Sequence, residues 1–110
     1  FLAEADRTRH AGLVDAAHAA WDLLWRDLGE RLHVPTGLLC LDETSGAWLP
    51  DSRRELRAGG YPCEDLSAAD VERRFPLLRG DGLRDATWVP TGGVLLARRI
   101  VEGLARHLAE

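Results

Sequence analysis

The pattern of apolar residues predicts a long amphipathic helix near the start of the chain, over about Thr8 to Leu28. Apolar side chains recur there at steps of three and four, which places them on one stripe of a helix. The stripe consists of Leu13, Val14, Ala17, Trp21, Leu24, Trp25 and Leu28. The opposite side carries Asp15, Asp22, Arg26 and Asp27, as expected of a solvated face. Gly29 follows as a helix stop.

Two short apolar runs after this helix predict a β-hairpin. The first run is Leu38–Leu41, the second is Ala47–Pro50, and the polar loop between them contains Gly46. The first run does not alternate apolar and polar residues, which is typical of a strand buried on both faces. We therefore expect the Leu38–Leu41 strand to be central in its sheet.

The rest of the chain predicts short helices and strands in alternation. The expected elements are a helix capped by Asp51 or Ser52 and running to about Ala58, a strand over Cys63–Leu66, a helix over Val71–Phe75, a strand over Leu83–Val89 and a last helix. Gly59-Gly60 ends the first of these helices, and Pro76 closes the second. Ser67 with Asp70 three residues later resembles a capping box.

The last helix is expected to follow a turn over Pro90–Gly93. Its predicted buried stripe consists of Ala97, Ile100, Val101, Leu104 and Leu108. The complete order is then α, β, β, α, β, α, β, α, with no internal repeat and no linker long enough to separate two domains. We expect residues 1–110 to form a single α+β unit, in which helices pack on a small, mostly antiparallel sheet.

Composition and charge narrow the class of protein. The 14 basic residues, all arginine, face 18 acidic ones, so the net charge is −4 and no basic surface is available to follow a nucleic-acid backbone. The arginine bias suggests a GC-rich bacterial genome. No apolar run reaches the roughly 20 residues of a membrane helix, and no signal peptide is apparent, so a soluble cytoplasmic protein is expected. Because the chain starts at Phe1 and stops at Glu110 inside a predicted helix, both ends are interpreted as cut.

Cysteine and histidine give no metal-site pattern. Cys40 and Cys63 are far apart, with no histidine at a ligand interval, and are expected to be buried free thiols. The four histidines are His10, His18, His33 and His107. None lies three or four residues from another, which is the spacing that directs two imidazoles at one metal, so surface histidines are expected.

The carboxylate doublets, the glycine pair and the tryptophans likewise form no catalytic or phosphate-binding motif. The doublets Asp42-Glu43 and Glu64-Asp65 point to opposite faces of a strand, so solvated charge or helix capping is favoured over acid–base catalysis. Gly92-Gly93 precedes a helix but lacks the third glycine of a phosphate-binding turn, so a tight turn is expected. Trp21 and Trp25 are explained by packing, whereas Trp48 and Trp88, near strand ends, leave open a pocket wall or a partner surface.

Several strings in order carry a resemblance to a known family. They are Trp21–Leu28 (Trp-Asp-Leu-Leu-Trp-Arg-Asp-Leu), Thr36–Leu39 (Thr-Gly-Leu-Leu), Leu66–Pro76 with its Glu-Arg-Arg-Phe-Pro end, and Gly92–Leu95 (Gly-Gly-Val-Leu). In this order and spacing the chain resembles the FAD-dependent oxidoreductases related to D-amino acid oxidase, and most closely the sarcosine oxidase and N-methyltryptophan oxidase branch. The resemblance extends over almost the whole chain, and Glu72–Pro76 is its most specific part.

The resemblance implies a role in a larger flavoenzyme. Such enzymes bind FAD on a Rossmann-type domain and pass a hydride equivalent from a carbon next to nitrogen to the flavin. The glycine-rich flavin turn and the arginine that binds the substrate carboxylate are then expected before Phe1, and the flavin-linking residues after Glu110. Arg7 and Arg9 lie past the expected arginine, so the role is not carried over to them. The chain is thus interpreted as a substrate-domain segment, without catalytic, cofactor-binding or metal residues, that covers the flavin and shapes the cavity for a small amine or amino acid.

Two other interpretations remain open at this stage. In one, the chain is a free-standing, non-enzymatic α+β module that binds a partner or small ligand through Trp48 or Trp88. In the other, it is a designed or excised domain without activity, which is compatible with the flavoenzyme segment described above and differs from it only in why the chain was cut. The sequence offers no basis for choosing among sarcosine, glycine, another amino acid or a larger amine as the substrate.

Overall fold

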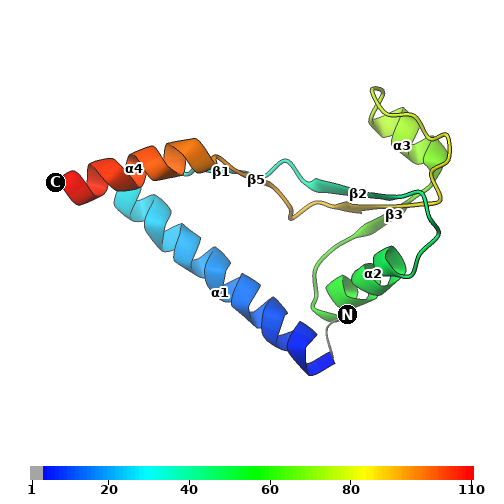
Figure 1. Ribbon diagram of the computed structural model, residues 1–110, viewed down its shortest axis with the longest axis horizontal. Helices are drawn as coiled ribbons and strands as arrows, with labels where there is room; N and C mark the ends of the chain where they lie inside the picture. The colour runs from blue at the N-terminus through cyan, green and yellow to red at the C-terminus, as the bar shows by residue number, and fades with distance from the viewer. Residues whose placement is uncertain (1–3) are drawn as a thin grey trace. The chain divides into compact units, whose positions relative to one another are not determined.

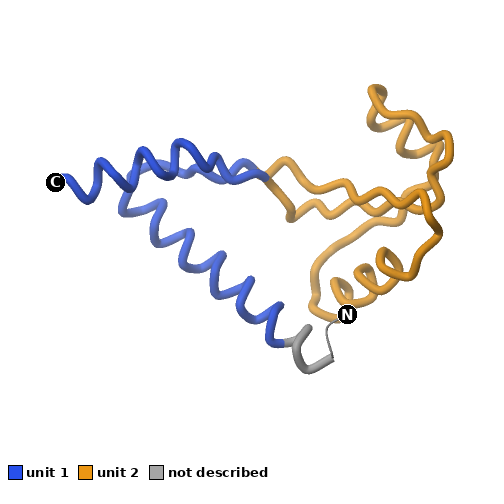
Figure 2. Tube along the Cα trace, in the orientation of Figure 1, with its two compact units in different colours: residues 1–34, 94–110 blue, residues 35–93 orange. Residues whose placement is uncertain are grey.

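The computed structural model describes the backbone of residues 4–110 and the side chains from residue 9 onward. The chain divides into two compact units, in each of which the residues contact mainly one another. Figure 2 colours the two units separately. Unit 1 comprises the chain up to Val34 together with Val94–Glu110, and unit 2 comprises Pro35–Gly93. Helices and small antiparallel sheets confirm the α+β class. The assignment of residues 1–110 to one substrate-domain segment stays a prediction.

Unit 1 is a pair of helices joined to a short ladder. Its elements are α1 (Glu4–Leu28), β1 (His33–Val34), β5 (Val94–Leu95) and α4 (Ala97–Ala109) (Figure 1). The long first helix is confirmed, and it ends where Gly29 adopts a positive φ of 70°. β1 and β5 pair antiparallel, which sequence reasoning missed because two-residue strands are too short to show a period. The Pro90–Gly93 turn therefore leads into β5 and only then into α4.

The core of unit 1 forms where α1 and α4 meet. Trp25, Leu32 and Ile100 are buried there, and Trp21 stacks on Trp25 with ring centroids 5.1 Å apart. Packing thus explains both tryptophans of α1, as predicted. Gly103 permits the close approach, because a Cβ at this position would lie 3.3 Å from the side chain of Leu28.

Unit 2 is a three-stranded antiparallel sheet with one helix on each face. Its elements are β2 (Leu38–Asp42), α2 (Trp48–Ala58), β3 (Glu64–Leu66), α3 (Ala68–Arg74) and β4 (Asp85–Val89), and the strand order is β2-β4-β3. The predicted centre of the sheet was wrong, since β2 is an edge strand and β4 is central. Leu38 and Leu41 of β2 are exposed. A run of apolar residues without alternation indicates that both faces of a strand are apolar. It does not reveal whether other parts of the protein cover both faces.

The predicted hairpin was also wrong, because the run Ala47–Pro50 opens helix α2. Trp48 is the first helical residue, and Pro50 lies in the first turn, where a backbone N–H has no helical acceptor. The expected caps fail for the same reason, since Asp51 is already inside the helix and its amide donates to the carbonyl of Ala47 at 2.9 Å. The predicted end at Gly59-Gly60 is confirmed.

The two faces of the sheet differ in character because side chains alternate along each strand. One face is apolar: Leu66 and Ala86 pack against Val71 of α3. Trp88 lies on the same face, with its ring 5.6 Å from that of Phe75. The other face carries polar side chains and is covered by α2.

Two glycines of unit 2 are required by close approaches. Gly37 has a φ of 77°, and the indole of Trp88 occupies the space that its Cβ would need. A Cβ on Gly92 would lie 2.6 Å from the Cβ of Leu38. The amide of Gly37 donates to the carbonyl of Gly92 at 2.9 Å, so these residues extend the β2–β4 ladder. Gly37 and Gly92, which both lie in the strings that carry the family resemblance, thus have a packing role in this fold.

The predicted capping box at the start of α3 is confirmed. The Ser67 hydroxyl accepts from the Asp70 amide at 3.1 Å, and the Asp70 carboxylate accepts from the Ser67 amide at 3.0 Å. Two amides at the helix start are satisfied in this way. These bonds, together with Arg73, lower the pKa of Asp70 to about 2.

Ser67→Ala is expected to lower the free energy of unfolding by about 1 kcal/mol, because it removes the acceptor for an N-terminal amide of α3. Urea unfolding followed by tryptophan fluorescence measures this change. Ser52→Ala is the matched control, since the Ser52 hydroxyl only donates back to the Trp48 carbonyl within α2. An equal loss in both variants would contradict the capping role.

The Asp70 carboxylate is expected to make stability depend on acid pH. Its pKa is lower in the folded chain than the ordinary value of 3.8, so its contribution is complete above about pH 4 and disappears as pH falls towards 2. The gap in urea midpoint between the parent and Asp70→Asn should therefore close between pH 5 and pH 2. Asp81→Asn, which removes the same charge from an exposed side chain, should show no such pH-dependent gap.

Candidate functional site

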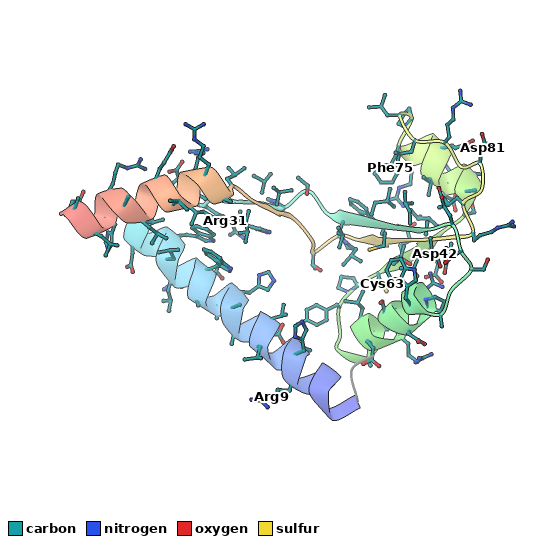
Figure 3. The ribbon with its side chains drawn as sticks, in the orientation of Figure 1. Arg9, Arg31, Asp42, Cys63, Phe75 and Asp81 are labelled. Carbon is teal, nitrogen blue, oxygen red and sulfur yellow. The ribbon has the colours of Figure 1, made fainter. Side chains whose placement is uncertain are left out.

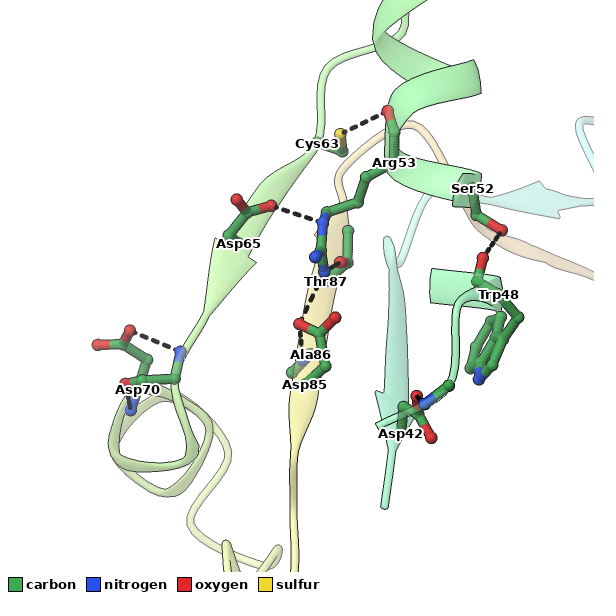
Figure 4. A network of polar contacts seen from close by, with 12 residues as sticks. Asp42, Trp48, Ser52, Arg53, Cys63, Asp65, Asp70, Asp85, Ala86 and Thr87 are labelled. Atoms are coloured by element: carbon green, nitrogen blue, oxygen red, sulfur yellow. Dashed lines mark hydrogen bonds and ion pairs between the residues drawn. The ribbon is translucent and has the colours of Figure 1, made fainter. Parts of the chain in front are cut away.

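The polar face of the unit 2 sheet holds a cluster centred on Arg53 of α2 (Figure 4). Its Nη1 donates to Asp85 Oδ1 at 2.7 Å and to Thr87 Oγ1 at 2.9 Å. Its Nε lies 3.1 Å from Asp65 Oδ1, and the Arg53 side chain is only 14% exposed. One guanidinium therefore joins α2 to both β3 and β4.

The strands present these partners to Arg53 by their register. Asp85 and Thr87 are two residues apart on β4, so they share a face, and Asp65 of β3 is the register partner of Thr87. The hydrogen bond that Arg53 donates to Asp85 raises the pKa of Arg53 further above its already high value. The group stays a cation with its Nη1 and Nε donors engaged, which suits a fixed structural charge rather than proton transfer.

A second polar cluster forms at the end of β2 around Asp42, which is labelled in Figure 3. Its carboxylate accepts from the amide and hydroxyl of Thr44, at 2.8 Å and 2.6 Å, and from the Gly46 amide at 3.1 Å. These bonds, chiefly those from Thr44, lower the pKa of Asp42, and the side chain of Trp48 contributes a further one. The carboxylate organises the loop that leads into α2.

The two carboxylates of each doublet have different surroundings in the structure. Asp42 is 3% exposed, so the expectation of a solvated or helix-capping charge was wrong for this residue, because the following loop folds over its carboxylate. Glu64 and Asp65 serve opposite faces of β3. Glu64 pairs with Arg74 of α3 at 2.8 Å, whereas Asp65 pairs with arginines of α2. Each carboxylate named here, except that of the exposed Glu43, is bound by partners within unit 2.

The two cysteines are less buried than the sequence suggested, and two of the histidines lie closer together than their spacing suggested. Both thiols are free and half-buried rather than buried; burial raises the pKa of Cys40, and Cys63 Sγ lies 3.9 Å from the Arg53 carbonyl. His18 and His33 come together edge to face, 6.4 Å between ring centroids, across a sequence gap that no spacing rule covers. Among the described residues, no group of three or more histidine, cysteine or acidic side chains could hold a metal ion.

The two remaining tryptophans have different surroundings. Trp88 is half-buried between Gly37 and Phe75, with the Arg74 guanidinium 5.8 Å from its ring. Its position is explained by packing. Trp48 is 50% exposed at the start of α2. Of these two, Trp48 alone presents a large apolar surface that a ligand or partner can reach.

Surface hollows and glycine turns add no flavin site in the described part of the chain. A hollow of about 440 Å³ lies at the end of α1 and is lined by Asp22, Trp25, Arg26, Gly29, Glu30 and Arg31. A smaller one of about 100 Å³ lies beside Gly103. Gly92-Gly93 precede strand β5, and Gly92 packs on Leu38, so the pair forms no phosphate cradle at a helix start. The described side chains, from residue 9 onward, therefore do not form a FAD site on their own.

The arginines near the expected carboxylate-binding position stay unassigned. Arg9 lies exposed on α1, while the side chain of Arg7 lies outside the described residues. No helix in the described residues is long and apolar enough to cross a membrane.

Comparison with known proteins gives the family. The sequence profile described as "FAD dependent oxidoreductase" matches residues 2–110. Mouse peroxisomal sarcosine oxidase is 31% identical over 102 residues, which cover 89% of this chain and 25% of that protein. N-methyl-L-tryptophan oxidase of Yersinia pestis is 24% identical over 102 residues, covering 93% of this chain and 28% of that protein. The chain thus spans about a quarter of the length of these curated relatives. Since the family profile matches nearly the whole chain, the chain belongs to the FAD-dependent oxidoreductase family related to sarcosine and N-methyltryptophan oxidases.

Proposed function

We propose that this chain is part of an FAD-dependent oxidoreductase that oxidises a C–N bond of an amine or amino acid. The observation that carries the proposal is the family match over residues 2–110, together with relatives named as oxidases of sarcosine and of N-methyl-L-tryptophan. Both of these compounds are N-methylated amino acids, so a small substrate of this class is the first to test. In such an enzyme FAD supplies the hydride acceptor.

Within that enzyme the chain's own part is structural. We propose that it covers the flavin and shapes one wall of the substrate cavity. The Arg53 and Asp42 clusters support this role, because their polar groups bind one another and hold α2 and its loop on the sheet. FAD would be bound mainly by segments outside residues 1–110. We further propose a cytoplasmic enzyme without nucleic-acid or membrane partners.

The absorbance spectrum of the protein expressed from the complete reading frame tests the proposal. Bound flavin should absorb in the blue, and this absorbance should bleach when sarcosine or N-methyl-L-tryptophan is added without oxygen. Glycine, which lacks the methyl group, is the matched control for substrate class. A folded product without flavin would sink the proposal.

The exposure of Trp48 favours a second candidate, a non-enzymatic α+β module that binds through this side chain. In that case the product of the complete reading frame would be colourless. Trp48→Phe would then remove a ligand-dependent change in fluorescence that Trp88→Phe leaves in place.

A further inference from the structure

The apolar stripe of α1 continues beyond the part of the helix that is packed. Core contacts begin at Trp21, whereas the side chains from Arg9 to Ala20 are all exposed. Leu13 and Val14 lie on the same stripe as Trp21 and are 61% and 42% exposed. The N-terminal half of α1 would be only marginally stable as an isolated helix in water, so its apolar side needs a surface to pack against.

The apolar stripe of α4 is likewise only partly covered by the rest of unit 1. Ile100 and Gly103 are buried in unit 1, whereas Val101 and Leu108 are 65% and 83% exposed. The expectation that all five stripe residues are buried was therefore wrong within unit 1. The pattern of an apolar stripe that only partly meets a neighbour indicates a second neighbour on the open side.

The polar residues beside the α4 stripe argue for a protein surface as that neighbour. Arg98 pairs with Glu102 at 3.0 Å, and Arg99 pairs with Glu30, so two of the three arginines of α4 are already paired within unit 1. Anionic lipid or nucleic acid would be drawn by unpaired basic side chains. An apolar protein face needs only the exposed valine and leucine side chains.

We propose that the open stripes of α1 and α4 are the surface on which unit 1 packs against the remaining polypeptide of the oxidoreductase. This inference rests on the proposed function. The occupant follows from length: the family profile matches nearly the whole chain, yet the chain spans only about a quarter of its curated relatives. The occupant is thus an apolar protein face encoded outside these 110 residues, not a second copy and not a small ligand.

Cysteine labelling tests this surface. Leu13→Cys, Val101→Cys and Leu108→Cys are made singly in a Cys40→Ala, Cys63→Ala background and alkylated with iodoacetamide. Glu102→Cys, on another side of α4, is the matched control. In the protein from the complete reading frame, the three stripe positions should react at least about tenfold more slowly than the control. In the 110-residue chain all four should react at similar rates.

Each of the other outcomes contradicts the proposed packing surface. Equal rates in the complete protein would mean that nothing covers the stripes. Slow labelling in the dilute 110-residue chain would mean that the chain covers them itself, and slow labelling only at high concentration would indicate a second copy. Flavin absorbance of the same samples separates the two proposals. A colourless product with protected stripes sinks the proposed function alone, and a flavoprotein with open stripes sinks the surface alone.

Discussion

Gly37→Ala is expected to lower the free energy of unfolding by about 3 kcal/mol or more. Two costs combine at this position, since alanine is strained at a φ of 77° and its Cβ would occupy the place of the Trp88 indole. The indole cannot simply move away, because Trp88 packs against Phe75. Urea unfolding at neutral pH measures the change.

Gly60→Ala is the matched control for this prediction. Gly60 has a similar φ of 80° but no atom within 4 Å of its Cβ position, so only the backbone strain remains, about 1 kcal/mol. Trp88→Leu should recover part of the Gly37→Ala loss, which a double-mutant cycle would show. Equal costs at Gly37 and Gly60 would mean that the indole does not restrict Gly37.

The sequence predicted those elements whose residues lie close together in the chain. The first helix shows an apolar stripe from Leu13 to Leu28 and a glycine stop, and the α3 cap needs only Ser67 and Asp70. The hairpin failed because the next element depends on a buried carboxylate. Asp42 holds the Thr44 and Gly46 amides, and the chain that leaves this loop enters α2 instead of a strand. An apolar run alone does not distinguish these outcomes.

The polar clusters could be predicted only in part. Alternation places Asp85 and Thr87 on one strand face, but Arg53 lies more than 30 residues away and reaches them only because α2 covers that face. The same holds for His18 and His33, which meet through the fold. The family was accessible because ordered strings carry it. The role of the segment towards flavin and substrate depends on residues that the strings do not contain.

Arg53→Met is the second large prediction, with an expected loss of about 2 kcal/mol in the free energy of unfolding. Breaking a buried pair costs more than this, but Asp85 and Asp65 keep some contact with water, which reduces the penalty. Thr87, which is 1% exposed, loses a donor and cannot turn to solvent. Arg54→Met is the control, since its pair with Asp51 is exposed and should change stability by less than about 0.5 kcal/mol.

The Arg53 prediction also decides what kind of residue this arginine is. A substrate-binding arginine would be held by few groups of its own chain, and its loss would change activity while leaving stability near that of the parent. Arg53 instead has its guanidinium engaged by Asp85, Thr87 and Asp65. Arg53→Met should therefore shift the urea midpoint, and Thr87→Val should make the Arg53→Met loss smaller in the double variant. Unchanged stability with altered turnover of an N-methyl amino acid would place Arg53 at the substrate rather than between α2 and the sheet.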